Sequence, residues 1–328
     1  MRGLATLMLL VALFSPCSRA LRGSVLTCSD RKTSARVTLV GTVHFNPASI
    51  RLAETAVRDA AADGALRAVA LESCPMRWNA TMQQQPAGSV LRSLLDNEMQ
   101  AAAEVADEVD GVEIVLVDQP IDETTSRLVR LFGLTLVDLV TPWSGGWGRI
   151  LRDIRQGYAQ VVSSGSAGPI DGGRRVLERA LDPSLLAGGP VALGRYLLAF
   201  AVTSPALCAL LIATTAYYAV YFGLVSGDGA WTAVTWSPAS TEPIATVGEG
   251  AILVDARAFV AFQLVQWVVY ARVFLVALLE ERNRVIARNI RHAAERGGRD
   301  ATVVAILGVA HLDGVRALLS EDEIAGVQ

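Results

Sequence analysis

The sequence predicts an α/β protein in which a mostly parallel sheet is flanked by helices and carries an inserted hydrophobic helical hairpin. Short apolar runs alternate with helical patterns over residues 36–140, which is typical of a parallel sheet covered by helices. The same pattern returns in 281–328. Between these halves, 195–280 is apolar enough to form two transmembrane helices, and a mean hydropathy of +0.39 agrees with a membrane component.

The N-terminal 23 residues read as a signal peptide. Arg2 precedes the apolar core LATLMLLVALF, and Ser18 and Ala20 are spaced like a cleavage signal. Residues 24–35 are rich in hydroxyl-bearing and basic side chains and are similar to a transit peptide. Together the two segments indicate import into an organelle such as a plastid, and a plain secretory signal is the alternative.

The first half, 36–140, is expected to begin with a buried strand at 35–41, ARVTLVG. A helix follows at 46–64, which Asn46 caps, Pro47 opens and Gly64 ends. Apolar runs predict two further strands, each followed by a helix. The strands are expected at 66–73 and 112–118, and the helices at 89–111 and 122–140.

The middle of the chain is expected to vary and then to enter a membrane. Gly and Pro recur over 141–194, which predicts a variable connection with two helical pieces. Residues 196–227 carry no charge and are longer than the ~20 residues a spanning helix needs. Residues 258–279 form a second apolar segment, and Arg272 lies near enough to its end for the guanidinium to reach the membrane surface. A buried helical hairpin in a large core is the alternative.

The second half, 281–328, repeats a short motif of the first. Residues 280–298 read as a charged helix, and 301–308 as a buried strand that leads into His311. The pattern G-x-x-H therefore occurs twice, ending at His44 and at His311, each time after a strand and before a helix. A single histidine would more often cap a helix or lie in a core, whereas the repetition favours a functional role. The third histidine, His292, lies among arginines and is assigned no role.

Polar residues follow four predicted strands. In an open α/β sheet, ligands bind outside the carboxyl ends of the strands. Two imidazoles with carboxylates are ligands for a divalent transition metal such as Mn, Co or Zn, which can acidify water and polarise a carbonyl. The two acids could instead cap helices. The predicted metal ligands are His44, Glu72, Asp118 and His311.

The cysteines do not indicate a second metal site or a disulfide framework, because no pair has C-x-x-C spacing. Cys74 is a nucleophile on paper, but no histidine is adjacent in the sequence, and a structural role is favoured.

Five segments, in order, resemble the motifs of TraB-domain proteins, a family related to PrgY, Tiki and GumN proteins. They are LVGTVHF, VALESCPMRW, VLVDQPIDETTSRLVR, LLEERNRVIARNI and ILGVAHLDGV. The similarity covers roughly 36–140 and 275–320, and the order of the motifs makes it specific. The resemblance implies an α/β fold built from related halves and, as in Tiki-type members, metal-dependent peptidase activity with manganese or cobalt.

The resemblance also implies site residues. It points to His44, Glu72 and His311, with support from Arg77, Asp118, Glu281 and Arg282. Arg77 or Arg282 is expected to bind a substrate carboxylate or stabilise an oxyanion. Asp118 is expected to be a fourth ligand or to orient a histidine.

Glu281 is a further catalytic candidate, with a structural ion pair to Arg77 as the alternative. Two departures from the family pattern stand out. The last-helix motif usually reads Glu-Arg-Asp and here ends in Asn283, and residues 141–280 match poorly.

A shared site requires both halves to lie on one side of a membrane, so the chain must cross zero or two times between them. The loop 223–251 has no Lys or Arg, whereas the flanks are Arg-rich. The positive-inside tendency therefore predicts that both halves face cytosol, stroma or matrix. The expected location is the membrane of an organelle, either a plastid or an endomembrane compartment, with the mitochondrion as another option.

The predicted function is a membrane-anchored, metal-dependent hydrolase acting on a peptide or small molecule. The alternative is a non-enzymatic membrane protein for signalling, peptide sequestration or organelle tethering. Nucleic-acid binding has no support, because the net charge is −3 and no basic stripe with interleaved aromatics is present.

Overall fold

The computed structural model describes residues 24–162, 175, 178–179, 181–204, 209, 213, 256–298 and 301–324. The chain divides into two compact units, one formed by residues 1–196 and 269–328 and the other by 197–268. The predicted signal peptide, 1–23, lies outside the described residues, as does most of the apolar segment 196–227.

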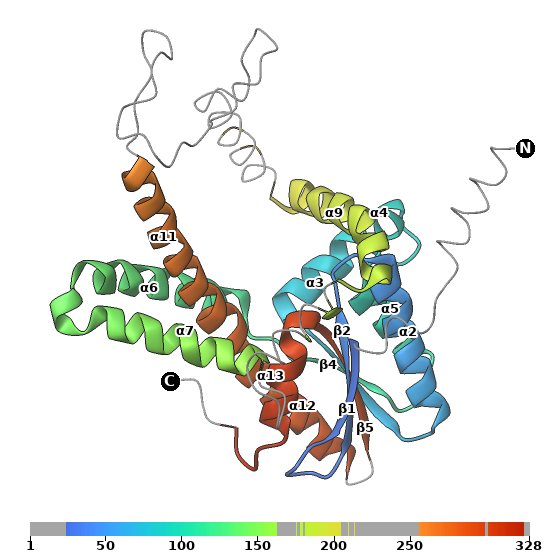
Figure 1. The fold of residues 1–328 in the computed structure, drawn as a ribbon. Coiled ribbons are helices and arrows are strands. Elements are labelled where there is room, and N and C mark those ends of the chain that lie inside the picture. Colours follow the sequence, from blue (N-terminus) through green and yellow to red (C-terminus); the bar gives the residue numbers. More distant parts are fainter. Residues whose placement is uncertain are drawn as a thin grey trace, which may run out of the picture. The chain divides into compact units, whose positions relative to one another are not determined.

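The first unit contains a five-stranded sheet in the order β1-β2-β5-β3-β4 (Figure 1). Strands β2, β5, β3 and β4 are parallel, and only β1 pairs antiparallel, with β2. This confirms an α/β fold with a mostly parallel sheet. The strands are β1 (Val25–Ser29), β2 (Arg36–Thr42), β3 (Leu66–Leu71), β4 (Glu113–Leu116) and β5 (Thr302–Gly308).

Strand β1 lies in the segment 24–35, which the sequence analysis assigned to a transit-like peptide. Instead, Val25 to Ser29 pair with Val40 to Arg36 along the edge of the sheet. The turn after β1 is held by Asp30, whose buried carboxylate accepts hydrogen bonds from Thr33 and from Arg291 of the second half. Residues 24–35 therefore belong to the folded unit.

Helices cover both faces of the sheet (Figure 1). Helices α2 (Pro47–Ala62) and α5 (Glu98–Asp107) pack their alanines and valines on one face, against Val69, Leu71 and Ile306. Helices α12 (Glu281–Gly297) and α13 (Leu312–Leu319) cover the other face, against Leu39 and Leu307 among others. Successive strand residues point to opposite faces, so one buried strand serves both cores.

Helix α2 confirms the predicted cap. The side chain of Asn46 accepts a hydrogen bond from the Ala48 amide at 2.9 Å, Pro47 stands at the first helical position, and Gly64 takes a left-handed φ of +70° after the helix ends. The helix predicted over 89–111 is instead broken into α4 (Val90–Leu94) and α5. Asn97 causes the break, because its side chain caps α5 by accepting from Gln100.

The remaining described elements include α3 (Pro75–Gln84), which the sequence analysis did not predict, and α6 (Ile121–Val140), which it did. The expected variable connection contains a short 3₁₀ turn η2 (Pro142–Ser144), α7 (Gly146–Val162) and the start of α9 (Pro183–Thr203). The second apolar segment forms α11 (Ala256–Val273) and the π-helical stretch η3 (Phe274–Glu280), which leads directly into α12. A short turn η4 (Val309–His311) joins β5 to α13.

Among the described residues, one helix, Pro183–Val202, is long and apolar enough to cross a membrane by length and composition. Only 11 % of its apolar window is buried. The second expected span, 258–279, does not meet that criterion, and the expectation that Arg272 reaches a membrane surface is wrong. Arg272 is buried and forms ion pairs with Asp138 at 2.8 Å and Asp153 at 2.6 Å.

Candidate functional site

The parallel register brings the four predicted strand ends to one edge of the sheet. Thr42 at the end of β2 pairs with Gly308 at the end of β5, and Leu71 at the end of β3 is the partner of both Ile306 and Leu116. The residues that follow these ends are the four predicted metal ligands. The site is therefore assembled from segments at both ends of the sequence by strand pairing alone.

Glu72 lies at the centre of this edge and is almost fully buried. Its Oε1 atom is 3.3 Å from His311 Nε2 and accepts a hydrogen bond from Arg282 Nη2 at 2.5 Å. Its Oε2 accepts from the Gly308 amide at 2.5 Å. Burial would raise the pKa of Glu72, but His311 and Arg282 outweigh it and hold this pKa well below its usual range. Glu72 is therefore a carboxylate.

Arg282 bridges Glu72 to Asp118. Its Nε and Nη2 donate to the two oxygens of Asp118 at 3.0 Å and 2.7 Å. Arg77 Nη2 donates to the same Asp118 Oδ2 atom, and the Gln119 amide donates to Oδ1. Asp118 thus neither faces a free ligand position nor caps the helix at 121; it holds two guanidinium groups at the sheet edge. Burial would lower the pKa of Arg282, but Asp118 and Glu72 raise it.

His311 is buried, and its ring is held by Asn283 of α12. Its Nδ1 atom lies 2.6 Å from Asn283 Oδ1, an acceptor, and donates to it, while Nε2 faces Glu72 Oε1 at 3.3 Å. The amide nitrogen of Asn283 has no hydrogen-bond partner within the part of the chain that the structure describes. Asn283 therefore orients the ring of His311 toward Glu72.

His44 is held in a similar way by a residue that the sequence analysis did not select. Its Nδ1 lies 2.5 Å from Oε1 of Glu98, in the first turn of α5, and Glu98 Oε2 accepts from the Phe45 amide at 3.2 Å. Glu98 is buried, whereas the His44 side chain is 47 % exposed. Desolvation would lower the pKa of His44, but the hydrogen bond and charge of Glu98 outweigh it and raise this pKa to about 9. His44 is therefore protonated at neutral pH.

Both histidines act electrostatically on the same carboxylate, because His311 and His44 each contribute to the lowered pKa of Glu72. They belong to one polar cluster, but His44 is not in contact with Glu72. Within the described ranges, no three His, Cys, Asp or Glu side chains are gathered closely enough to hold a metal ion. Glu281 lies apart from the cluster, with its carboxylate 3.9 Å from Arg127 of α6 rather than beside Arg77.

The loop that carries His44 is fixed by the beginning of α9. Asn46 donates to the Leu185 carbonyl at 2.9 Å, and Arg195 donates to the Phe45 carbonyl at 3.3 Å. The Phe45 ring packs edge-on against Tyr196 with centroids 6.3 Å apart. Phe45 has a φ of +61°, a left-handed conformation that is unfavourable for a bulky side chain. These contacts hold the strained residue and thereby place His44.

The glycines of the G-x-x-H motifs serve close packing. A Cβ atom on Gly41 would lie 2.3 Å from Leu312 Cδ1, and one on Gly308 would lie 3.3 Å from Glu72 Oε2. Neither glycine has a positive φ. The motif therefore lets α13 and the carboxylate of Glu72 approach the strand ends, and the turn before each histidine does not depend on glycine.

Cys74 is completely buried at the N-terminus of α3, two residues after Glu72. Burial would raise the pKa of its thiol, but hydrogen bonds involving Arg77 lower it. The burial agrees with the structural role favoured by the sequence.

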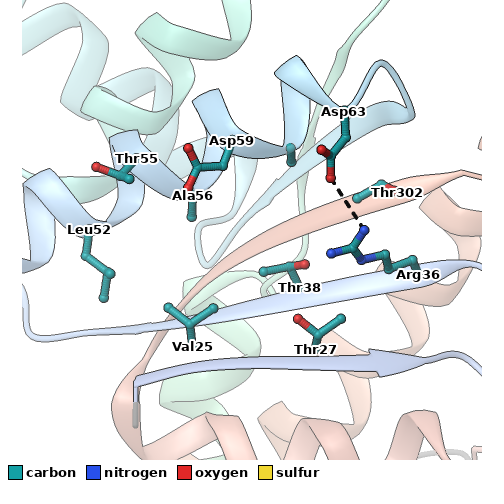
Figure 2. Close-up of a pocket in the computed structure, with 11 residues that line it drawn as sticks. Val25, Thr27, Arg36, Thr38, Leu52, Thr55, Ala56, Asp59, Asp63 and Thr302 are labelled. Carbon is teal, nitrogen blue, oxygen red and sulfur yellow. Dashed lines mark hydrogen bonds and ion pairs between the residues drawn. The ribbon is translucent and has the colours of Figure 1, made fainter. Parts of the chain in front are cut away.

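A hollow of about 230 Å³ lies away from this cluster (Figure 2). It is bounded by α2 and by the opposite ends of the strands, where Thr302 begins β5 and Arg36 begins β2. Arg36 pairs across it with Asp63 at 3.5 Å, and both side chains are exposed. The residues that line this hollow include no histidine or cysteine.

Comparison of the chain with protein-family models, with curated proteins and with solved structures found no match.

Proposed function

We propose that this chain is a membrane-anchored, metal-dependent hydrolase that cleaves a peptide or related small molecule, as its resemblance to TraB-domain proteins implies. One observation carries the proposal. Both histidines of the repeated motif have Nδ1 engaged by a buried oxygen, from Glu98 and from Asn283, which leaves Nε2 of His44 for a ligand and directs Nε2 of His311 at the carboxylate of Glu72. Metal-binding histidines are commonly oriented by such a partner.

The donor chemistry fits a divalent transition ion. Nε2 of His44, Nε2 of His311 and the carboxylate of Glu72 are ligands that suit Mn²⁺, Co²⁺ or Zn²⁺. Since the three groups are not gathered around one point, binding requires the half-exposed His44 ring to approach the other two. Binding also requires His44 to lose its proton, so it competes with protonation near neutral pH. Asp118 is left out of the ligand set because arginines occupy both of its oxygens.

The arginines have separate roles in this proposal. A bound ion would polarise a carbonyl and acidify water. Arg77, whose side chain is 39 % exposed, can bind the carboxylate of a substrate or the oxyanion that develops during hydrolysis. Arg282 is more deeply buried and keeps Glu72 ionised and in place. Asn283 and Glu98 orient the two rings.

Membrane anchoring rests on the apolar sequence between the two halves. Residues 196–227 carry no charge and are longer than the ~20 residues that a spanning helix needs, whereas α9 up to Tyr196 packs on the loop of His44 and stays on the side of the site. A shared site then requires a second crossing before Val269, where the chain re-enters the first unit. The organelle follows only from the N-terminal sequence, and we propose a plastid or endomembrane compartment.

The experiment combines metal content with hydrolysis by the full chain in detergent. Protein loaded with Mn²⁺, Co²⁺ or Zn²⁺ is incubated with a defined peptide pool, and cleavage is followed by mass spectrometry. His44→Ala and His311→Ala should lose both the ion and cleavage, whereas His292→Ala, a change at an exposed histidine paired with Glu295, should keep both. Equal metal content in all four proteins, or cleavage that persists without either motif histidine, would contradict the proposal.

A non-enzymatic role is the second candidate, favoured by the ion pairing inside the cluster. Each of its three carboxylates, Glu72, Glu98 and Asp118, is already paired with an arginine or a histidine. Such a network can hold a sheet edge together without any ligand. Ordinary folding with no metal uptake and no cleavage would support a tethering or sequestering protein.

A further inference from the structure

Helices α6 and α7, joined by the turn η2, form a hairpin (Figure 1). This hairpin exposes an unusual amount of apolar surface. Residues 131–148 contain a single charged residue, Asp138. Large apolar side chains there are open to solvent in the folded unit, several by half or more. They are Phe132, Leu134, Leu136, Val137, Val140 and Trp143. A patch of this kind on a soluble protein marks a contact with a partner or a membrane.

The inner side of the same hairpin is polar. Thr135 and Asp138 of α6 are buried and face Arg272, whose guanidinium also binds Asp153 of α7. Arg149 of α7 donates to Asp138 as well. The cluster contains two arginines and two aspartates and is therefore neutral.

This distribution is the reverse of the one expected in water, where an amphipathic helix turns its apolar face inward. Helices in lipid keep ionisable groups inside a bundle and paired with one another, while apolar side chains face outward. Two glycines of α7 allow the helices to approach closely. A Cβ atom on Gly146 would lie 2.2 Å from the Asp138 carbonyl oxygen, and one on Gly157 would lie 2.9 Å from Leu275 Cβ.

The turn between the helices satisfies much of its own polarity. Thr141 Oγ1 donates to the Val137 carbonyl at 2.7 Å, and Ser144 Oγ donates to the Thr141 carbonyl at 2.9 Å. The Gly145 amide donates to the Pro142 carbonyl at 3.1 Å. Backbone groups that are already paired lose little on leaving water.

We propose that the turn end of this hairpin, residues 132–147, enters one leaflet of a lipid bilayer. The apolar part of α6, Phe132 to Val140, rises roughly 12 Å at 1.5 Å per residue. This is less than half of the ~30 Å hydrocarbon thickness, so the hairpin penetrates without crossing. Trp143 and Trp147 lie at the turn end, and indole rings favour the region between headgroups and acyl chains.

Two features favour lipid over a second protein as the partner of this apolar surface: the flanking charges and the adjoining apolar segment of the chain. Arg130 and Arg152 are exposed just before and after the apolar end, where anionic headgroups would attract them. Arg272, which ties the hairpin together, belongs to the apolar segment 258–279, and its helical neighbours Tyr270 and Phe274 are also half exposed. This inference is independent of the hydrolase proposal, because none of these residues belongs to the site of Glu72.

The test uses tryptophan fluorescence of the full chain reconstituted in vesicles of phosphatidylcholine and phosphatidylglycerol at 3:1. Emission of wild-type protein is compared with that of the double variant Trp143→Phe, Trp147→Phe, so the difference reports these two indoles. Lipid brominated near the headgroup should quench more than half of the emission from these two indoles, and lipid brominated deeper in the acyl chain should quench less of it. Trp78 on α3 is the control: its emission, taken as the difference between wild type and Trp78→Phe, should not be quenched by either lipid. Unchanged melting temperatures would show that the variants fold.

Two outcomes would overturn the proposal. If brominated lipid leaves the difference unchanged while aqueous iodide quenches it, the hairpin end lies in water. If neither agent quenches it and sedimentation in detergent shows a dimer, a second copy of the chain covers this surface instead of lipid.

Discussion

Replacing Glu98 by Gln tests how the site holds His44. The side chain keeps its size, and its amide oxygen can still accept from the Phe45 amide, but the negative charge is lost. Glu98 supplies both the hydrogen bond and the charge that raise the pKa of His44. Without them, desolvation and the Arg77 charge are opposed only by the charge of Glu72, and the pKa of His44 should fall from about 9 toward its ordinary value of about 6.5.

The variant should also be less stable by about 1–3 kcal/mol, because a charge-assisted hydrogen bond to a buried group is removed. The assay is an NMR titration of ring protons in protein labelled with ¹³C-histidine, in which only three side chains are visible. Glu104→Gln, on the same helix but exposed and paired with Arg92, is the matched control and should leave His44 titrating near pH 9.

If His44 still titrates near pH 9 after Glu98→Gln, Glu98 is not the source of its raised pKa. The charge of His44 would then depend on some other group, and Glu98 would lose its role in placing this ring. A large fall in the Glu104→Gln control would equally contradict the assignment, because it would point to a general effect of charge on α5.

Three further predictions follow from the same contacts. Arg272→Met removes one of the two arginine partners of buried Asp138 and the partner of half-buried Asp153, and should cost about 3 kcal/mol in denaturation by detergent or heat. Arg296→Met, in an exposed ion pair, should cost about 1 kcal/mol or less. The raised pKa of His44 adds stability that is complete below about pH 6.5 and is lost as pH rises through about 9. Metal-free protein should therefore melt at a lower temperature at pH 9.5 than at pH 6. The variant His44→Gln should show a smaller difference between the two melting temperatures. Gly314→Ala places a Cβ atom 2.2 Å from the amide nitrogen of Asn283, which orients His311, and should destabilise the protein by about 1–3 kcal/mol. Gly133→Ala, in open space on a helix, should stabilise it by about 0.5–1 kcal/mol. Thermal melting measures both changes.

The sequence was sufficient for the strands that end in the site, because each is an apolar run followed by a polar residue. Parallel pairing then brings His44, Glu72, Asp118 and His311 to one edge. The role of each residue at that edge was harder to predict from the sequence. Asp118 looked like a ligand from its position, but only the three-dimensional arrangement puts Arg77 and Arg282 on its oxygens.

Other features have no local signal at all. Glu98 is 54 residues from His44 and, in the sequence, looks like an ordinary acid in the first turn of a helix. Strand β1 was missed because its hydroxyl-bearing and basic neighbours are typical of targeting peptides. The orientation of Arg272 depends on aspartates more than 100 residues earlier, so its sequence position near the end of an apolar run suggested the wrong environment.

The central claim is that both motif histidines and Glu72 serve one ion, and a zinc titration of ¹³C-histidine-labelled protein tests it most directly. Because Zn²⁺ is diamagnetic and shifts the signals of the rings that coordinate it, the signals of His44 and His311 should move together and saturate at one equivalent, at a pH near 8, while that of His292 stays in place. A shift of only one of the two rings, or similar shifts of all three, would show that the histidines do not share an ion.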